Sequence, residues 1–204
     1  MNGLICVQGG REFTDECREM DAAWLKLADR RRTCIAPLAS AAGVQYRTTA
    51  DEGAEYLRSL GVDDIWMAPE PDHAVDGAVR AIVDADIVVI PGASPARARK
   101  RLVDTAVGAA LRAHLAAGGV LVGASAGAMV LADLMLLPDD DMQVRSGLGV
   151  LPDLVLPHYG ETRAEVVDQT RDQLLDACRS DQAAVGRPAG QLVAVAQLEL
   201  AQHR

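Results

Sequence analysis

The sequence predicts an α/β fold in one domain over residues 1–204: a three-layer sandwich with helices on both faces of a mainly parallel sheet. Two observations favour this fold. Short apolar runs alternate along the chain with longer amphipathic segments, which is the order that parallel strands with crossover helices require. No linker, internal repeat or low-complexity tract divides the sequence, and its 204 residues are enough for one sizeable core.

Six short apolar runs predict buried strands, because several are rich in Val and Ile and none is long enough for a typical helix. They are LICVQ (4–8), TCIAPL (33–38), DIWMAP (64–69), DIVVIPG (86–92), GVLVGA (119–124) and LVLPH (154–158). QLVAVAQLEL (191–200) predicts a last strand. In parallel sheets ligands bind beyond the carboxyl ends of the strands, and two of these runs end there in small residues.

Helix signals lie between the strands. Thr14, followed by two acidic residues, can cap a helix that runs to about residue 31. Ser94-Pro95 predicts the start of a helix over 95–117 that contains His114 at its surface. An apolar stripe supports this helix: Val103, Val107, Leu111 and Leu115. A further helix is expected over 161–178.

Composition excludes several classes of function. The net charge is −9 and no basic cluster occurs, which argues against binding to nucleic acid or to an anionic membrane surface. The four cysteines are widely spaced and form no CxxC pair, so we expect reduced thiols and neither a zinc site nor a disulfide framework. The N-terminus has no signal-peptide pattern, and we expect a cytoplasmic protein.

The longest uncharged run spans residues 115–132 and includes GGVLVGASAGAMVLA. Its length suggests a membrane helix. However, four glycines and a serine interrupt the run, it begins inside an amphipathic helix, and no basic residues flank it closely. A strand, a sharp turn and a short helix therefore fit the run better than a membrane span.

The turn in this run, Gly123–Gly127, matches the pattern G-x-S-x-G. In this pattern the serine occupies a strained turn between a strand and a helix, and the small neighbours let a substrate approach it. Backbone N–H groups at the turn can stabilise an oxyanion. Ser125 is therefore a candidate nucleophile, although a purely structural turn is an alternative in a chain so rich in Ala and Gly.

A nucleophilic serine needs a base, and the base needs an orienting acid. Of the four histidines, His158 follows a predicted strand and so is expected at the same sheet edge as Ser125. The aspartates 139–141 lie between the serine and the histidine in the sequence, and Glu161 is a competing carboxylate.

These residues together resemble the dipeptidase E and cyanophycinase family of serine peptidases, which has a class I glutamine amidotransferase-like fold. GASAGA resembles the family's elbow, GLGVLPDLVLPHY (147–159) resembles the segment that leads to its histidine, and GETR (160–163) resembles the stretch that opens the next helix. DIVVIPGAS occupies the place of the strand before a glycine-rich turn. The resemblance covers residues 86–173.

The resemblance implies Ser125 as nucleophile, His158 as general base and Asp141 as the third triad member, with Asp139 and Asp140 as alternatives. It further implies oxyanion donors from the backbone of Ala126 and of Gly92 or Ala93. Arg163 matches an arginine that binds an acidic substrate side chain. We also expect substrate contacts from three neighbours of these residues: Ser94, Tyr159 and Glu161. Pro91–Ser94 replaces the family's usual glycine-rich turn, and the loop before GETR is shorter than in dipeptidase E.

The sequence thus predicts a serine exopeptidase for short peptides that prefers a substrate carboxylate, either an aspartyl side chain or a free C-terminus. Carboxypeptidase and cyanophycinase or isoaspartyl-type cleavage are alternatives on the same scaffold, and an inactive peptide-binding or small-molecule-binding protein is an alternative of another class. A dinucleotide-binding module is disfavoured because QGGREF (8–13) lacks the third glycine. We expect no cofactor and no metal; a homo-oligomer is compatible with the sequence.

Overall fold

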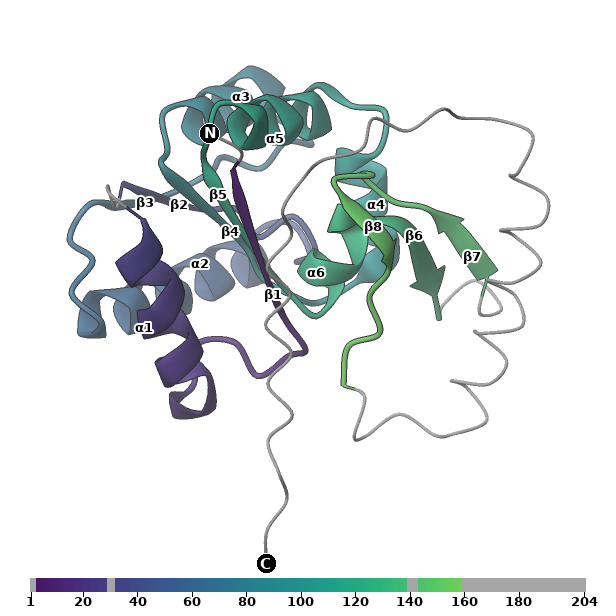
Figure 1. The fold of residues 1–204 in the computed structure, drawn as a ribbon. Coiled ribbons are helices and arrows are strands. Elements are labelled where there is room, and N and C mark those ends of the chain that lie inside the picture. Colours follow the sequence, from purple (N-terminus) through teal and green to yellow (C-terminus); the bar gives the residue numbers. More distant parts are fainter. Residues whose placement is uncertain (1–2, 29–31, 139–142, 159–204) are drawn as a thin grey trace, which may run out of the picture.

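The computed structural model describes residues 3–28, 32–138 and 143–158 (Figure 1). Its centre is a parallel sheet whose strands lie in the order β1-β5-β4-β2-β3. Their bounds are β1 Leu4–Gln8, β2 Thr33–Ile35, β3 Ile65–Met67, β4 Ile87–Ile90 and β5 Val120–Ala124. Each neighbouring pair is parallel. The first five predicted strands are confirmed, and all except β1 are shorter than the apolar runs that predicted them.

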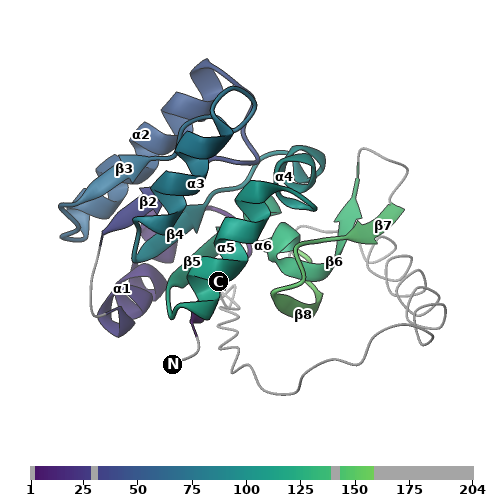
Figure 2. The same ribbon diagram turned by 90° about the horizontal axis from the view of Figure 1, so that it is seen from above.

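Helices cover both faces of this sheet, as Figure 2 shows. α1 (Arg18–Leu27) and α2 (Val44–Ser59) pack on one face. The other face carries α3 (Val75–Val83), α4 (Pro95–Leu102), α5 (Ala106–Ala116) and α6 (Ala126–Leu131). Strand β4 shows why both faces are apolar: Ile87 and Val89 join the first core, whereas Val88 and Ile90 join the second. The predicted α/β/α layering is confirmed.

Three expectations about the helices need correction. Thr14 does not cap a helix; its hydroxyl donates to Arg11 O at 2.6 Å, and a short 3₁₀ turn over Asp15–Cys17 precedes α1. The helix expected over 95–117 is two helices, because Asp104 takes a left-handed φ of 59° and ends α4 before α5 begins. The cap predicted at Ser94 is present: its side chain accepts from Arg97 N at 3.3 Å.

The third correction concerns His114, which was expected at the helix surface but is buried. It is 8 % exposed, and its Nε2 lies 3.2 Å from Val120 O, between the end of α5 and the start of β5. Burial lowers the pKa of this imidazole. The neutral ring is therefore a structural group that ties the helix to the strand after it.

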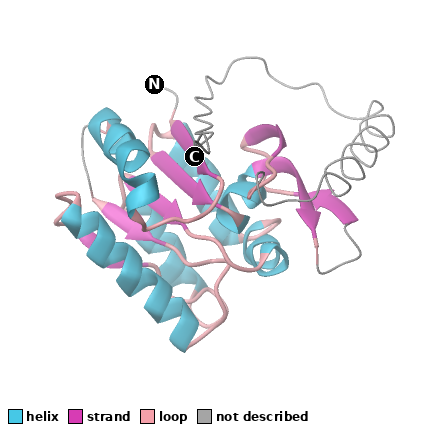
Figure 3. Ribbon diagram, turned by 90° about the horizontal axis from the view of Figure 1, so that it is seen from below, coloured by secondary structure: helices cyan, strands magenta, loops and turns pink. Residues whose placement is uncertain are grey.

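The strand predicted over 154–158 is also wrong, both in its bounds and in the sheet to which it belongs. The strand is β8 (Leu151–Leu154), and it pairs with β6 (Ala132–Leu137) in a second sheet completed by β7 (Gln143–Ser146) (Figure 3). Its pairing with β6 ends at Leu154, and no strand covers residues 155–158. His158 therefore follows a loop beside the main sheet, not a strand within it.

Two further predicted elements, the helix over 161–178 and the strand over 191–200, lie outside the described residues. Within the described part of the chain, no helix has both the length and the apolar character that crossing a membrane requires.

Candidate active site

Three adjacent strands of the main sheet end at the site. In β5, Ala124 pairs with Gln8 of β1, and Gly123 pairs with Ile90 of β4. The residues that follow these strands come from three distant parts of the sequence, yet they leave the sheet at the same edge, where Ser125 N donates to Gln8 O at 2.9 Å. This edge is the position at which open α/β sheets bind ligands.

Ser125 lies in the predicted turn between β5 and α6, with φ 47° and ψ −115°. A left-handed conformation is unfavourable for a residue with a side chain and is typical of a nucleophile elbow. The flanking glycines are required by close backbone contact: a Cβ on Gly127 would lie 1.9 Å from Ile90 O, and one on Gly123 would lie 2.7 Å from Gly127 O. The elbow is therefore held by packing of α6 against β4.

The structure brings His158 to Ser125: the distance from Oγ to Nε2 is 3.1 Å. The histidine backbone is held by a hydrogen bond from its N to Gly9 O at 2.9 Å. Gly10 makes room for the ring, because a Cβ there would lie 2.3 Å from His158 Cε1, and its φ of 138° also favours glycine. An alcohol within hydrogen-bond reach of an imidazole is the arrangement that nucleophilic catalysis needs.

A buried polar network lies beneath the elbow. Asp21, 3 % exposed, accepts hydrogen bonds from the side chains of Gln8, Trp24 and Tyr56. Burial raises the pKa of Asp21, and the three donors oppose that shift. Because Gln8 also accepts from Ser125 N, this network fixes the strand end on which the nucleophile rests.

The cysteines of the described residues are free thiols. Burial raises the pKa of Cys6 and Cys34 to about 12 and that of Cys17 to about 11. These thiols stay protonated at neutral pH and are therefore poor nucleophiles. Of the described residues at the site, Ser125 is therefore the candidate nucleophile.

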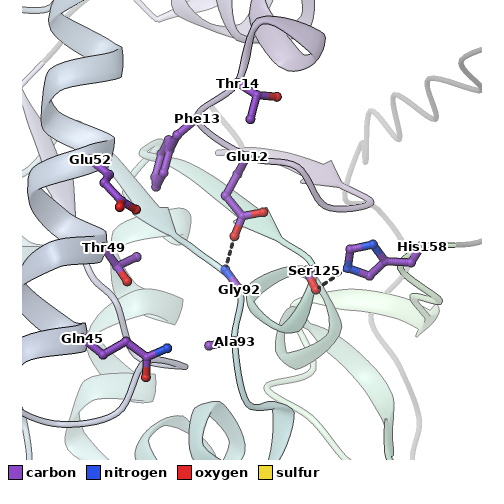
Figure 4. A pocket seen from close by; sticks show the side chains of 10 residues that line it. All are labelled: Glu12, Phe13, Thr14, Gln45, Thr49, Glu52, Gly92, Ala93, Ser125 and His158. Atoms are coloured by element: carbon purple, nitrogen blue, oxygen red, sulfur yellow. Dashed lines mark hydrogen bonds between the residues drawn. The ribbon is translucent and has the colours of Figure 1, made fainter. Parts of the chain in front are cut away.

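A cavity of about 580 Å³ opens beside the Ser125–His158 pair (Figure 4). Besides this pair, it is lined by Glu12, Phe13, Thr14, Gln45, Thr49, Glu52, Gly92 and Ala93. Glu12 Oε1 accepts a hydrogen bond from Gly92 N at 2.7 Å, so a carboxylate holds one of the amides expected to bind an oxyanion. Within the described ranges, no three His, Cys, Asp or Glu residues cluster so as to hold a metal ion.

The other predicted site residues divide into two groups. Ala126 is buried at the start of α6, Ala93 is exposed at the cavity, and Ser94 caps α4 and lines a second cavity with Arg97 and Lys100. The remaining predicted residues lie outside the described ranges: Asp139, Asp140, Asp141, Tyr159, Glu161 and Arg163.

The model of peptidase family S51 matches residues 4–197. The chain belongs to peptidase family S51. It is thus a serine peptidase, which agrees with the resemblance noted in its motifs. No curated protein matches the sequence.

Solved structures share the fold of this S51 peptidase at low sequence identity. A crystal structure of a peptidase from an acI-B1 Actinobacterium has a TM-score of 0.69 and 20 % identity, over 82 % of this chain and 75 % of the other. A protein assigned as peptidase E from Listeria monocytogenes EGD-e has a TM-score of 0.58 and 15 % identity, over 86 % and 88 % of the two chains. At these identities the likeness shows the fold alone.

Sequence reasoning missed several lining residues of the S51 peptidase. Gln45, Thr49 and Glu52 lie on one stripe of α2, spaced four and three residues apart, and this helix is far from the elbow in sequence. Glu12 lies in the QGGREF segment, which drew attention only for what it lacks as a dinucleotide-binding pattern. The polar stripe on α2 is a signal that could have identified this wall of the cavity, but a solvated helix face has the same pattern.

Proposed function

We propose that this S51 peptidase hydrolyses short peptides by nucleophilic attack of Ser125 Oγ on the scissile carbonyl, with His158 as general base. The observation that carries the proposal is the 3.1 Å contact between Ser125 Oγ and His158 Nε2 at a strained elbow. His158 accepts the hydroxyl proton and passes it to the leaving amine. Water then attacks the acyl-enzyme carbonyl while His158 accepts its proton, and this proton passes to Ser125 Oγ as the acid product is released.

Backbone amides stabilise the oxyanion in this mechanism. Ala126 N stands at the start of α6, directly after the nucleophile, and Gly92 packs close to Ser125, since a Cβ on Gly92 would be 3.3 Å from Ser125 Oγ. Preorganised amides that face the developing charge are typically the largest single contribution to such catalysis. Asp141 orients His158, with Asp139, Asp140 and Glu161 as competing carboxylates.

Cleavage near a chain end is favoured as the mode of action. The resemblance to dipeptidase E supports a dipeptidase that acts on short peptides, with Arg163 binding a substrate carboxylate. Carboxypeptidase cleavage uses the same chemistry near the C-terminus, and isoaspartyl-type cleavage uses it on an amide bond of the aspartyl side-chain carbonyl. Mass spectrometry of the products from Asp-X, X-Asp and longer peptides distinguishes these modes.

The nucleophile is tested by Ser125→Ala. We expect hydrolysis of every cleaved peptide to fall by about three orders of magnitude or more, because no other group replaces the attacking oxygen. The free energy of unfolding should change by less than about 0.5 kcal/mol, since alanine retains the small side chain. A variant that keeps wild-type turnover would refute the assignment of Ser125, and a wild-type protein that binds but never cleaves the panel would favour the peptide-binding alternative.

A further inference from the structure

The carboxylate of Glu12 is bound to the Gly92 amide, which the proposed mechanism assigns to the oxyanion. Its Oε1 accepts from Gly92 N at 2.7 Å, and Gly92 packs so closely on the elbow that a Cβ there would lie 2.8 Å from Ser125 Cβ. When a substrate carbonyl takes the Gly92 amide, Glu12 loses that hydrogen bond. A displaced carboxylate beside a bound peptide is stabilised by a new donor, and a cation is the strongest one available.

The backbone holds Glu12 in this position at a conformational penalty. The residues on either side, Arg11 and Phe13, have φ values of 58° and 64°, which are unfavourable for residues with side chains. The segment is also tied down: Arg11 pairs with Glu16 at 2.8 Å, and the Phe13 ring packs against α2, where a Cβ on Gly53 would lie 2.6 Å from Phe13 Cζ. Such strain is found at positions where a side chain is presented for function.

The opposite wall of the cavity adds a second carboxylate. Figure 4 shows Gln45, Thr49 and Glu52 following one another along α2, across the cavity from Ser125, with Phe13 between the two glutamates. Among the described residues that line the cavity, two are carboxylates and none is Lys or Arg. The two carboxylates on these walls of the cavity attract positive groups.

We propose that Glu12 and Glu52 form a subsite for a cationic group on the acyl side of the substrate. The proposal rests on the proposed function, because it places the substrate carbonyl on Gly92 N. An α-ammonium group is two bonds from the carbonyl carbon of an N-terminal residue, so it falls beside Glu12. A Lys or Arg side chain extends further and reaches towards Glu52. Both groups supply the same chemistry, a cation that replaces the Gly92 amide as the partner of Glu12.

The test compares hydrolysis of six dipeptides, in which Asp, Lys or norleucine precedes Leu, each with a free or an acetylated amino group. Two ratios of kcat/KM are measured: free over acetylated, which reports the α-ammonium group, and Lys over norleucine, which reports the side-chain cation. Because each ratio is taken within one variant, a general change in catalysis caused by freeing Gly92 N cancels. The wild type is compared with Glu12→Gln and Glu52→Gln, and with Glu55→Gln, an exposed glutamate on the same helix that does not line the cavity.

We expect Glu12→Gln to lower at least one ratio by about tenfold or more, the size of a lost charge-assisted hydrogen bond, with Glu55→Gln within about twofold of wild type. The ratio that falls identifies the source of the cation. The inference is overturned if Glu12→Gln and Glu52→Gln both leave both ratios unchanged while Ser125→Ala still abolishes cleavage. Cleavage that survives Ser125→Ala would instead overturn the proposed function, so the two failures are distinguishable.

Discussion

Backbone strain in this protein is concentrated around the candidate active site. Six non-glycine residues of the described chain have positive φ, and five of them line the cavity or flank Glu12. These five are Arg11, Phe13, Ala93, Ser125 and His158. Each such conformation costs about 1–3 kcal/mol, so the surrounding packing has to hold it in place. The strain sets the directions of the candidate nucleophile Ser125, the candidate base His158 and the Glu12 carboxylate, which relaxed backbone would not place together.

Gly10 offers a test of the site at the scale of one residue. In Gly10→Ala the new Cβ would lie 2.3 Å from His158 Cε1, so the imidazole has to move away from Ser125. A displacement of about 1 Å lowers catalysis by about a hundredfold, and we expect a loss of that size in kcat/KM. Steady-state kinetics on the best-cleaved dipeptide measures it.

Gly61→Ala is the matched control for Gly10→Ala. Gly61 also has a positive φ, 84°, but a Cβ there meets nothing within 4 Å. Both variants should lose about 1 kcal/mol in urea unfolding from the strained backbone, whereas only Gly10→Ala should lose activity. Equal activity in the two variants would show that Gly10 does not set the position of His158.

At the scale of elements, the break between α4 and α5 is the clearest departure from the sequence-based prediction. The apolar stripe over 103–115 is compatible with one continuous helix, but Thr105 caps α5 by accepting from Gly108 N at 3.2 Å. Its hydroxyl also donates to Arg101 O at 2.8 Å, which joins the two helices. Periodicity does not show such a break, because the residues on both sides keep the same apolar spacing.

Thr105→Ala tests this cap. Loss of the side-chain acceptor leaves an N–H of the first turn unsatisfied, and we expect the free energy of unfolding to fall by about 1 kcal/mol. Thr48→Ala, at an exposed position inside α2, should stay within about 0.5 kcal/mol of wild type. Urea denaturation followed by circular dichroism compares the two, and equal stabilities would mean that the cap does not stabilise α5.

At the scale of the whole molecule, Arg101 joins segments that are far apart in the sequence. Its side chain, 3 % exposed, donates from α4 to Leu38 O at 3.1 Å and Ser40 O at 2.8 Å in the segment after β2, and it pairs with Asp72. The guanidinium holds the pKa of Asp72 below its usual range. This contact anchors the loop that leads into α2, which carries one wall of the cavity.

Arg101→Gln tests this anchor. The substitution leaves two carbonyls without their charged donor, and we expect the free energy of unfolding to fall by about 3 kcal/mol. Lys100→Gln removes the same charge from the next residue, which is exposed, and should change stability by less than about 0.5 kcal/mol. A loss of similar size in both variants would show that net charge, not the buried anchor, determines the effect.

Most of the fold and part of the site could be predicted from the sequence. Five strands of the main sheet, the layering and the elbow at Ser125 are local in origin, since a buried strand and a sharp turn each leave a pattern in neighbouring residues. The second sheet was not predicted, and neither was the loop that brings His158 to the site. Their pairing depends on which edge is available in three dimensions, and no local pattern records that.

The sequence by itself determined which residues are the candidates for the chemistry: a serine between two nearby glycines, and a histidine that follows it along the chain. Only the tertiary structure decided what surrounds that chemistry. Glu12 and Glu52 are 40 positions apart, and they line one cavity because β1 ends beside β5 and α2 packs on the adjoining face. Local propensities fix how a segment folds, whereas strand order and helix packing fix which distant side chains share a site.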